Sequence, residues 1–188
     1  MNGCASMNAR RFFSGNIGVV FLGSTLLFSY ADCAVAARAE PPKGWRYPTE
    51  ADYVGNWKEF RKETPEPFHV RADFNGDSVV DDVWILLRTT GKGSGLFVFL
   101  SEPSGSVKLL KLEDDPKDEY PQRMGLAVVR PGLYQTACGR GHSECDRDEP
   151  KMLELNYPGI NFFMYESANS FFYWDKKSSS FKRVWMSD

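Results

Sequence analysis

The sequence predicts a mainly β fold of the α+β class, an antiparallel β-meander sheet or small sandwich with one N-terminal helix. Short apolar segments recur along residues 40–188, and clusters of Gly, Pro, Asp and Ser separate them. Between residues 68 and 112, no connection between these segments is long enough for the crossover helix that parallel strands require. Hydrophobic residues make up 42% of the chain and aromatic residues 14%, so the bulk of it can bury a core.

Residues 1–39 are predicted to be a secretory signal peptide. Arg10 and Arg11 form its charged region, and residues 17–28 form an apolar run. The alternative is an N-terminal membrane anchor, but the run is shorter than the about 20 residues that a bilayer span needs. We therefore expect a periplasmic or secreted protein with no membrane span in its mature form. Two cleavage options follow the run, at Ala34-Val35-Ala36 and at Ala37-Arg38-Ala39.

The single β-rich domain, residues 40–188, is expected to begin with a linker and a helix. Residues 40–47 are rich in Pro and charge, which is typical of a linker. Thr49 is predicted to cap a helix, with Asp52 three residues on as the acid of the cap. Three aromatic residues then fall at the spacing of one helical face, and this face is expected to cover the sheet: Tyr53, Trp57 and Phe60.

Ten segments are predicted to be strands. Residues 68–72 alternate apolar and polar side chains, as in a half-buried strand. Residues 83–87 and 96–100 are apolar on both sides, which predicts central strands. A polar stretch over 113–122 is expected to be a loop. The remaining strands are expected at residues 107–112, 126–129, 133–137, 152–155, 160–165, 171–174 and 181–186.

An acidic loop lies between the first two of these strands. Side-chain oxygens stand at its positions 1, 3, 5 and 9, and this odd-numbered spacing can point several of them at one hard cation. The predicted ligands are Asp73, Asn75, Asp77, the carbonyl of Val79, and Asp81. Three carboxylates packed together would repel one another without a cation. We expect weak Ca²⁺ binding, near 10⁻⁴–10⁻³ M in order of magnitude, as in extracellular modules. The alternative is a metal-free hairpin turn, because Asn-Gly-Asp is common turn chemistry.

The acidic loop resembles the calcium loops of FG-GAP repeats in integrin-like propellers, and more loosely dockerin loops. The matching residues are Asp73, Asn75, Asp77 and Asp81, and the resemblance implies that they bind Ca²⁺. Ser78 stands where those loops have glycine, which strains the turn if the position needs a positive φ. The chain has one such loop, whereas a propeller needs many copies.

Two cysteines remain after the predicted signal peptide. Cys138 and Cys145 are separated by a short polar loop, and in an oxidising compartment they are expected to form a disulfide. The alternative is a zinc site that adds His142, but it lacks a clear fourth ligand nearby.

The sequence lacks the motifs of common enzymes. It has no Gly-x-Ser-x-Gly, no His-Glu-x-x-His and no phosphate-binding glycine-rich loop. Its net charge of −2 argues against nucleic-acid binding. We expect an exported, non-enzymatic binding or interaction protein for an unknown protein or carbohydrate, including an envelope inhibitor or immunity protein. The alternative is a small cell-envelope hydrolase that uses paired carboxylates.

Three further stretches, 95–100, 136–139 and 171–175, make the chain similar to uncharacterised single-domain exported bacterial proteins. That resemblance implies location and the cysteine pairing, and no activity. In the last stretch, Phe171 and Phe172 face opposite sides of one strand. Both faces are therefore expected to be covered, or else one of them is a binding surface.

Overall fold

The computed structural model describes residues 38–187. The predicted signal peptide lies outside this range, apart from Arg38 and Ala39. Within the described range, no helix has the length and apolar character needed to cross a bilayer.

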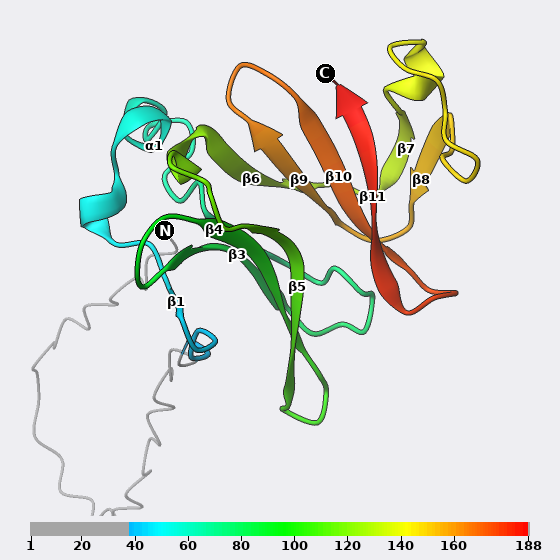
Figure 1. Cartoon of the computed structure of the whole chain (residues 1–188). Coiled ribbons are helices and arrows are strands. Elements are labelled where there is room, and N and C mark those ends of the chain that lie inside the picture. Colours follow the sequence, from blue (N-terminus) through cyan, green and yellow to red (C-terminus); the bar gives the residue numbers. More distant parts are fainter. Residues whose placement is uncertain (1–37, 188) are drawn as a thin grey trace, which may run out of the picture. The chain divides into compact units, whose positions relative to one another are not determined.

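The prediction of a mainly β fold with antiparallel sheets is confirmed (Figure 1). All ten predicted strands are present, with ends shifted by a few residues. The strands are β1 Trp45–Arg46, β2 His69–Ala72, β3 Asp81–Arg88, β4 Ser94–Ser101, β5 Val107–Asp115, β6 Met124–Val129, β7 Gly132–Gln135, β8 Met152–Leu155, β9 Gly159–Met164, β10 Asn169–Asp175 and β11 Ser180–Ser187.

The described strands form two larger sheets and one small one (Figure 1). In the first sheet the order is β1-β3-β4-β5, and β2 also pairs with β3. The second sheet has the order β11-β10-β9-β6, and β7 pairs with β8 alone. Strands β3 and β4 are buried almost throughout, because their side chains are apolar on both faces.

Phe171 and Phe172 of β10 are both buried, which confirms the expectation that the strand is covered on both faces at these two residues. Phe172 belongs to a core that it shares with β3, β4 and Trp57. Phe171 points to the other face and belongs to a smaller core with Leu153 and Leu155 of β8. Successive side chains of a strand point to opposite faces, so one aromatic pair stabilises two layers.

The predicted N-terminal helix is broken in two. A 3-10 turn spans Glu50–Asp52, and α1 spans only Gly55–Glu59. Gly55 has a φ of +52°, which no continuous right-handed helix contains. The predicted capping contact is present, since the Asp52 carboxylate accepts the backbone N–H of Thr49 at 2.7 Å.

The predicted linker at residues 40–47 contains a strand. In β1, Trp45 and Arg46 pair with the end of β3. Trp45 is buried and meets the ring of Phe97 edge-on, with 4.7 Å between the ring centroids. The expected loop at 113–122 begins later than predicted, because β5 continues to Asp115. Both differences arise from pairing with a neighbouring strand, which the local sequence pattern does not record.

Candidate functional site: the acidic loop

The acidic loop, residues 73–82, closes the hairpin between β2 and β3. Antiparallel pairing places Ala72 opposite Asp81, so the two ends of the loop meet. Phe74 is fully buried in the larger core although its neighbours are polar. This side chain anchors the loop and leaves Asn75 and Asp77 at an open cavity of about 490 Å³.

The carboxylate of Asp73 organises the backbone of the loop. Its Oδ1 accepts the N–H groups of Gly76 at 2.7 Å and Asp77 at 3.1 Å, and its Oδ2 accepts the N–H of Ser78 at 2.8 Å. Such contacts stabilise the negative charge of a carboxylate. Backbone N–H groups therefore stabilise part of the negative charge for which the sequence predicts a cation.

Asn75 and Asp77 face each other across the turn. The Asn75 Nδ2 donates to Asp77 Oδ2 at 3.1 Å, and Asn75 Oδ1 accepts the N–H of Asp77 at 3.0 Å. Asp77 Oδ1 accepts the N–H of Val79 at 2.8 Å. The contact between Asn75 and Asp77 Oδ2 is the one that an entering cation would displace.

Asp81 lies beneath the loop and is fully buried. Its two oxygens accept the N–H of Phe74 at 3.0 Å and the N–H of Ser101 at 2.9 Å, so it joins the loop to the end of β4. Burial raises the pKa of Asp81 to about 6, and the charges of Asp77 and Asp73 act in the same direction. The two N–H donors oppose this change, because they favour the ionised form.

The five predicted ligands thus lie in one loop, but hydrogen bonds rather than a ring of carboxylates bring them together. Over residues 38–187, no three His, Cys, Asp or Glu side chains converge in a way that could hold a metal ion. A calcium loop also uses amide oxygens, backbone carbonyls and water. Asn75 Oδ1 and the carbonyl of Val79 would supply the first two, with Asp73 and Asp77 as half-buried carboxylates.

The departure at Ser78 has the backbone consequence that the sequence predicts. Ser78 has a φ of +72°, a region that favours glycine. Gly76 also has a positive φ, +76°, and a Cβ there would lie 2.1 Å from Cε1 of Tyr157. The loop therefore needs glycine at position 76 for space, and holds serine at position 78 under strain.

Replacing Ser78 by glycine is expected to raise the free energy of unfolding by about 0.5–1 kcal/mol, because the strained φ is relieved. Chemical denaturation measures the change. Ser167→Gly is the matched control, since its φ is not positive and glycine should cost stability there. Equal losses in both variants would contradict the assignment of strain to Ser78.

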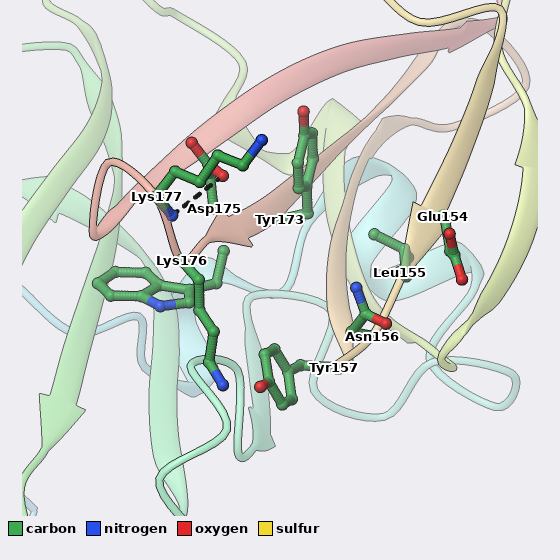
Figure 2. Close-up of a pocket in the computed structure, with 9 residues that line it drawn as sticks. Glu154, Leu155, Asn156, Tyr157, Tyr173, Asp175, Lys176 and Lys177 are labelled. Carbon is green, nitrogen blue, oxygen red and sulfur yellow. Dashed lines mark hydrogen bonds between the residues drawn. The ribbon is translucent and has the colours of Figure 1, made fainter.

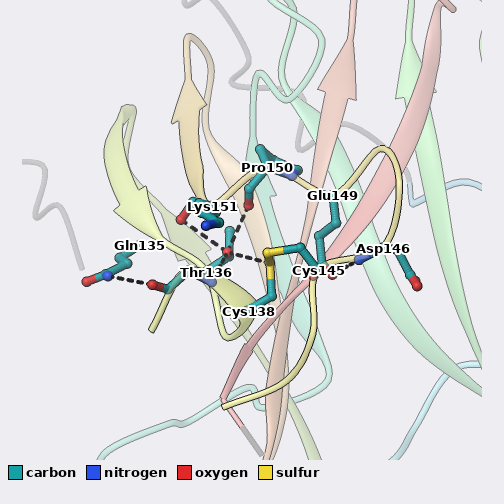
Figure 3. The surroundings of a disulfide bond; sticks show 9 residues. Gln135, Thr136, Cys138, Cys145, Asp146, Glu149, Pro150 and Lys151 are labelled. Carbon is teal, nitrogen blue, oxygen red and sulfur yellow. Dashed lines mark hydrogen bonds between the residues drawn. A yellow bond between two sulfur atoms is a disulfide. The ribbon is translucent and has the colours of Figure 1, made fainter. Parts of the chain in front are cut away.

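Cys138 and Cys145 form the predicted disulfide (Figure 3). The zinc alternative is wrong, because both sulfur atoms are bonded to each other. Thr136 fixes the loop beside the bridge: its Oγ1 donates to the carbonyl of Pro150 at 2.8 Å and accepts the N–H of Gly139 at 3.1 Å. The bridge therefore holds a loop that already packs on the start of β8.

Removing the bridge is expected to lower the free energy of unfolding by about 2–3 kcal/mol, because the loop it closes is short. The change is measured on the double variant Cys138→Ala/Cys145→Ala by urea denaturation. Reduction of the native chain should produce the same loss, and the reductant should not affect the variant. Full stability of the reduced native chain would argue against the bridge.

His69 stands at a polar position of the alternating strand β2, but it is not solvated. The side chain is only 12% exposed and stacks on Trp84 with 3.7 Å between ring centroids. Its Nε2 lies 2.7 Å from Asp82 Oδ1, and its Nδ1 lies 3.1 Å from Glu66 Oε2. His69 therefore clamps β2 to β3 and is not directed at the acidic loop's ion ligands.

An open cavity of about 450 Å³ holds two carboxylates of the kind that the hydrolase alternative requires (Figure 2). They belong to Glu154 and Asp175. Hydrogen bonds from Ser178 and Lys182 lower the pKa of Asp175 to about 2. A carboxyl group that stays ionised cannot serve as the general acid of a glycosidase-type pair. Asp175 therefore cannot be the general acid of a hydrolase in this cavity.

The fold and the loop define a class, an antiparallel β protein with an acidic turn and a disulfide. No protein-family model, curated protein or solved structure matches the chain.

Proposed function

We propose that this protein is an exported, non-enzymatic binding protein whose acidic loop holds a calcium ion. The observation that carries the proposal is the loop itself. Asp73 gathers three backbone N–H groups around one turn, and Asn75 and Asp77 face an open cavity from it. An ion reaching the loop from that cavity would meet oxygens and no cationic side chain except Lys108.

The disulfide supports export, because such bridges persist in oxidising compartments. The N-terminal contacts favour one of the two cleavage options. The guanidinium of Arg38 lies over the rings of Tyr47 and Trp84, at 4.7 and 4.2 Å from their centroids. The carbonyl of Ala39 accepts the hydroxyl of Tyr47 at 2.6 Å. Cleavage after Ala36 would keep both residues in the mature chain.

Calorimetric titration of the mature chain, residues 37–188, with Ca²⁺ tests the proposal. We expect a dissociation constant of about 10⁻⁴–10⁻³ M. In about 10 mM Ca²⁺ the free energy of unfolding should then rise by about 1–3 kcal/mol. Mg²⁺ should bind more weakly, because it demands a stricter geometry.

Asp77→Ala should weaken calcium binding by about tenfold or more, because it removes a charged ligand. Asp148→Ala is the matched control: it removes an exposed acid far along the chain and should leave the affinity unchanged. Absence of both heat and thermal stabilisation in the native chain would refute calcium binding.

A further inference from the structure

Trp174 separates two open cavities. The first, of about 450 Å³, lies between the β8–β9 connection, residues 154–157, and the end of β10, residues 173–177 (Figure 2). The second, of about 490 Å³, lies between the acidic loop and the β4–β5 turn. Trp174 is half-buried and lines both of them, so the two cavities meet at this residue and form a two-part groove.

The aromatic rings of this groove are held in place. Trp174 meets Phe181 edge-on, with 5.3 Å between centroids. Tyr157 lies against Gly76, so closely that any side chain at that position would overlap its ring. The Lys176 ammonium lies 5.1 Å from the centroid of the same tyrosine. Rigid aromatic side chains lose little entropy when a ligand packs on them.

The charged side chains that line the first cavity are balanced in sign. In the first cavity two acidic side chains, Glu154 and Asp175, stand beside two basic ones, Lys176 and Lys177. Asn156 adds an amide that can both donate and accept. A balanced lining gives no attraction to a polyanion such as a nucleic acid.

We infer that this groove binds an oligosaccharide across Trp174. A sugar ring offers an apolar C–H face to an aromatic ring and a rim of hydroxyls that both donate and accept hydrogen bonds. The groove offers the matching groups, with Trp174 and Tyr157 beside amide, carboxylate and ammonium groups. Its two cavities, each a few hundred Å³, suit consecutive small rings rather than a protein surface.

The inference deepens the proposed function by naming a ligand class, and it rests on that function only in part. The second cavity includes Asn75 and Asp77 of the acidic loop, whereas the first includes none of the proposed calcium ligands. Calcium should therefore strengthen sugar binding through the second cavity without being required for contact with the first.

The test is calorimetric titration of the mature chain with chitotetraose, cellotetraose, xylotetraose and maltotetraose, each in calcium and in chelator. At least one sugar should bind, and Trp174→Ala should weaken it by about tenfold or more, the order of one lost aromatic contact. Trp185→Ala is the control, since Trp185 is exposed on β11 and lines neither cavity. Asn156→Ala, which leaves the aromatic packing intact, should also weaken binding while the melting temperature stays constant.

Failure of all four sugars to bind overturns the inference, as does binding that survives both Trp174→Ala and Asn156→Ala. Binding to a peptide array with no response to the sugars overturns it as well. Sugar binding without any calcium binding would leave the inference standing and refute the proposed calcium loop. Calcium binding without sugar binding would support the calcium loop and overturn the sugar inference.

Discussion

Replacing Trp57 by alanine is expected to lower the free energy of unfolding by about 3–5 kcal/mol. Trp57 is fully buried, and its ring packs on Phe68 with 5.0 Å between centroids. Its Nε1 donates to the carbonyl of Met124 at 2.7 Å, which joins α1 to the first residue of β6. The variant would create a cavity and leave a half-buried carbonyl without its donor.

Urea denaturation measures this loss of stability, and two other variants serve as comparisons. Trp57→Phe keeps a ring against Phe68 but removes the N–H, so it should lose less than the alanine variant. Trp185→Ala removes a tryptophan that is 45% exposed and should cost about 1 kcal/mol or less. If Trp57→Ala were no worse than Trp185→Ala, the short helix would not be part of the core.

The second large effect is expected at Asp81. Asp81→Ala would leave two N–H groups, of Phe74 and Ser101, without an acceptor. Each unsatisfied buried donor costs about 1–3 kcal/mol, so we expect a total loss of about 2–4 kcal/mol after the cost of burying the charge is removed. The loop should lose its link to β4, and calcium affinity should fall with it.

Denaturation with and without calcium separates these two effects. Asp81→Asn can still accept one of the two N–H groups, so its loss should be about half that of the alanine variant. Asp148→Ala, in an exposed loop, should stay within about 0.5 kcal/mol of the native chain. Unchanged stability of Asp81→Ala would contradict the role of Asp81 as the link beneath the loop.

The strands could be predicted from the sequence because their patterns are local. The two-sided apolar segments of β3 and β4 and the alternation in β2 are visible without any knowledge of neighbours. The strand β1 could not be predicted, because two residues carry no periodicity and Trp45 is buried only by its partners. The expected helix is interrupted at Gly55, because this residue has a φ of +52° that the spacing of the aromatic residues does not reveal.

The acidic loop could also be predicted, from the spacing of its oxygen-bearing residues. The hydrogen bonds within the loop could not be predicted from the sequence. The sequence shows that three carboxylates are close; it does not show that Asp81 turns inward to bind two backbone N–H groups. The groove beside the loop was hidden for a different reason. Tyr157 and Trp174 reach Asn75 and Gly76 only through tertiary packing.

The most direct test of the calcium loop is an anomalous difference map from a crystal of the mature chain grown in Ca²⁺. We predict a peak among the side-chain oxygens of Asp73, Asn75 and Asp77 and the carbonyl of Val79, with the Asn75–Asp77 contact displaced. A map with no peak there, and with Asn75 still bonded to Asp77, would contradict the account.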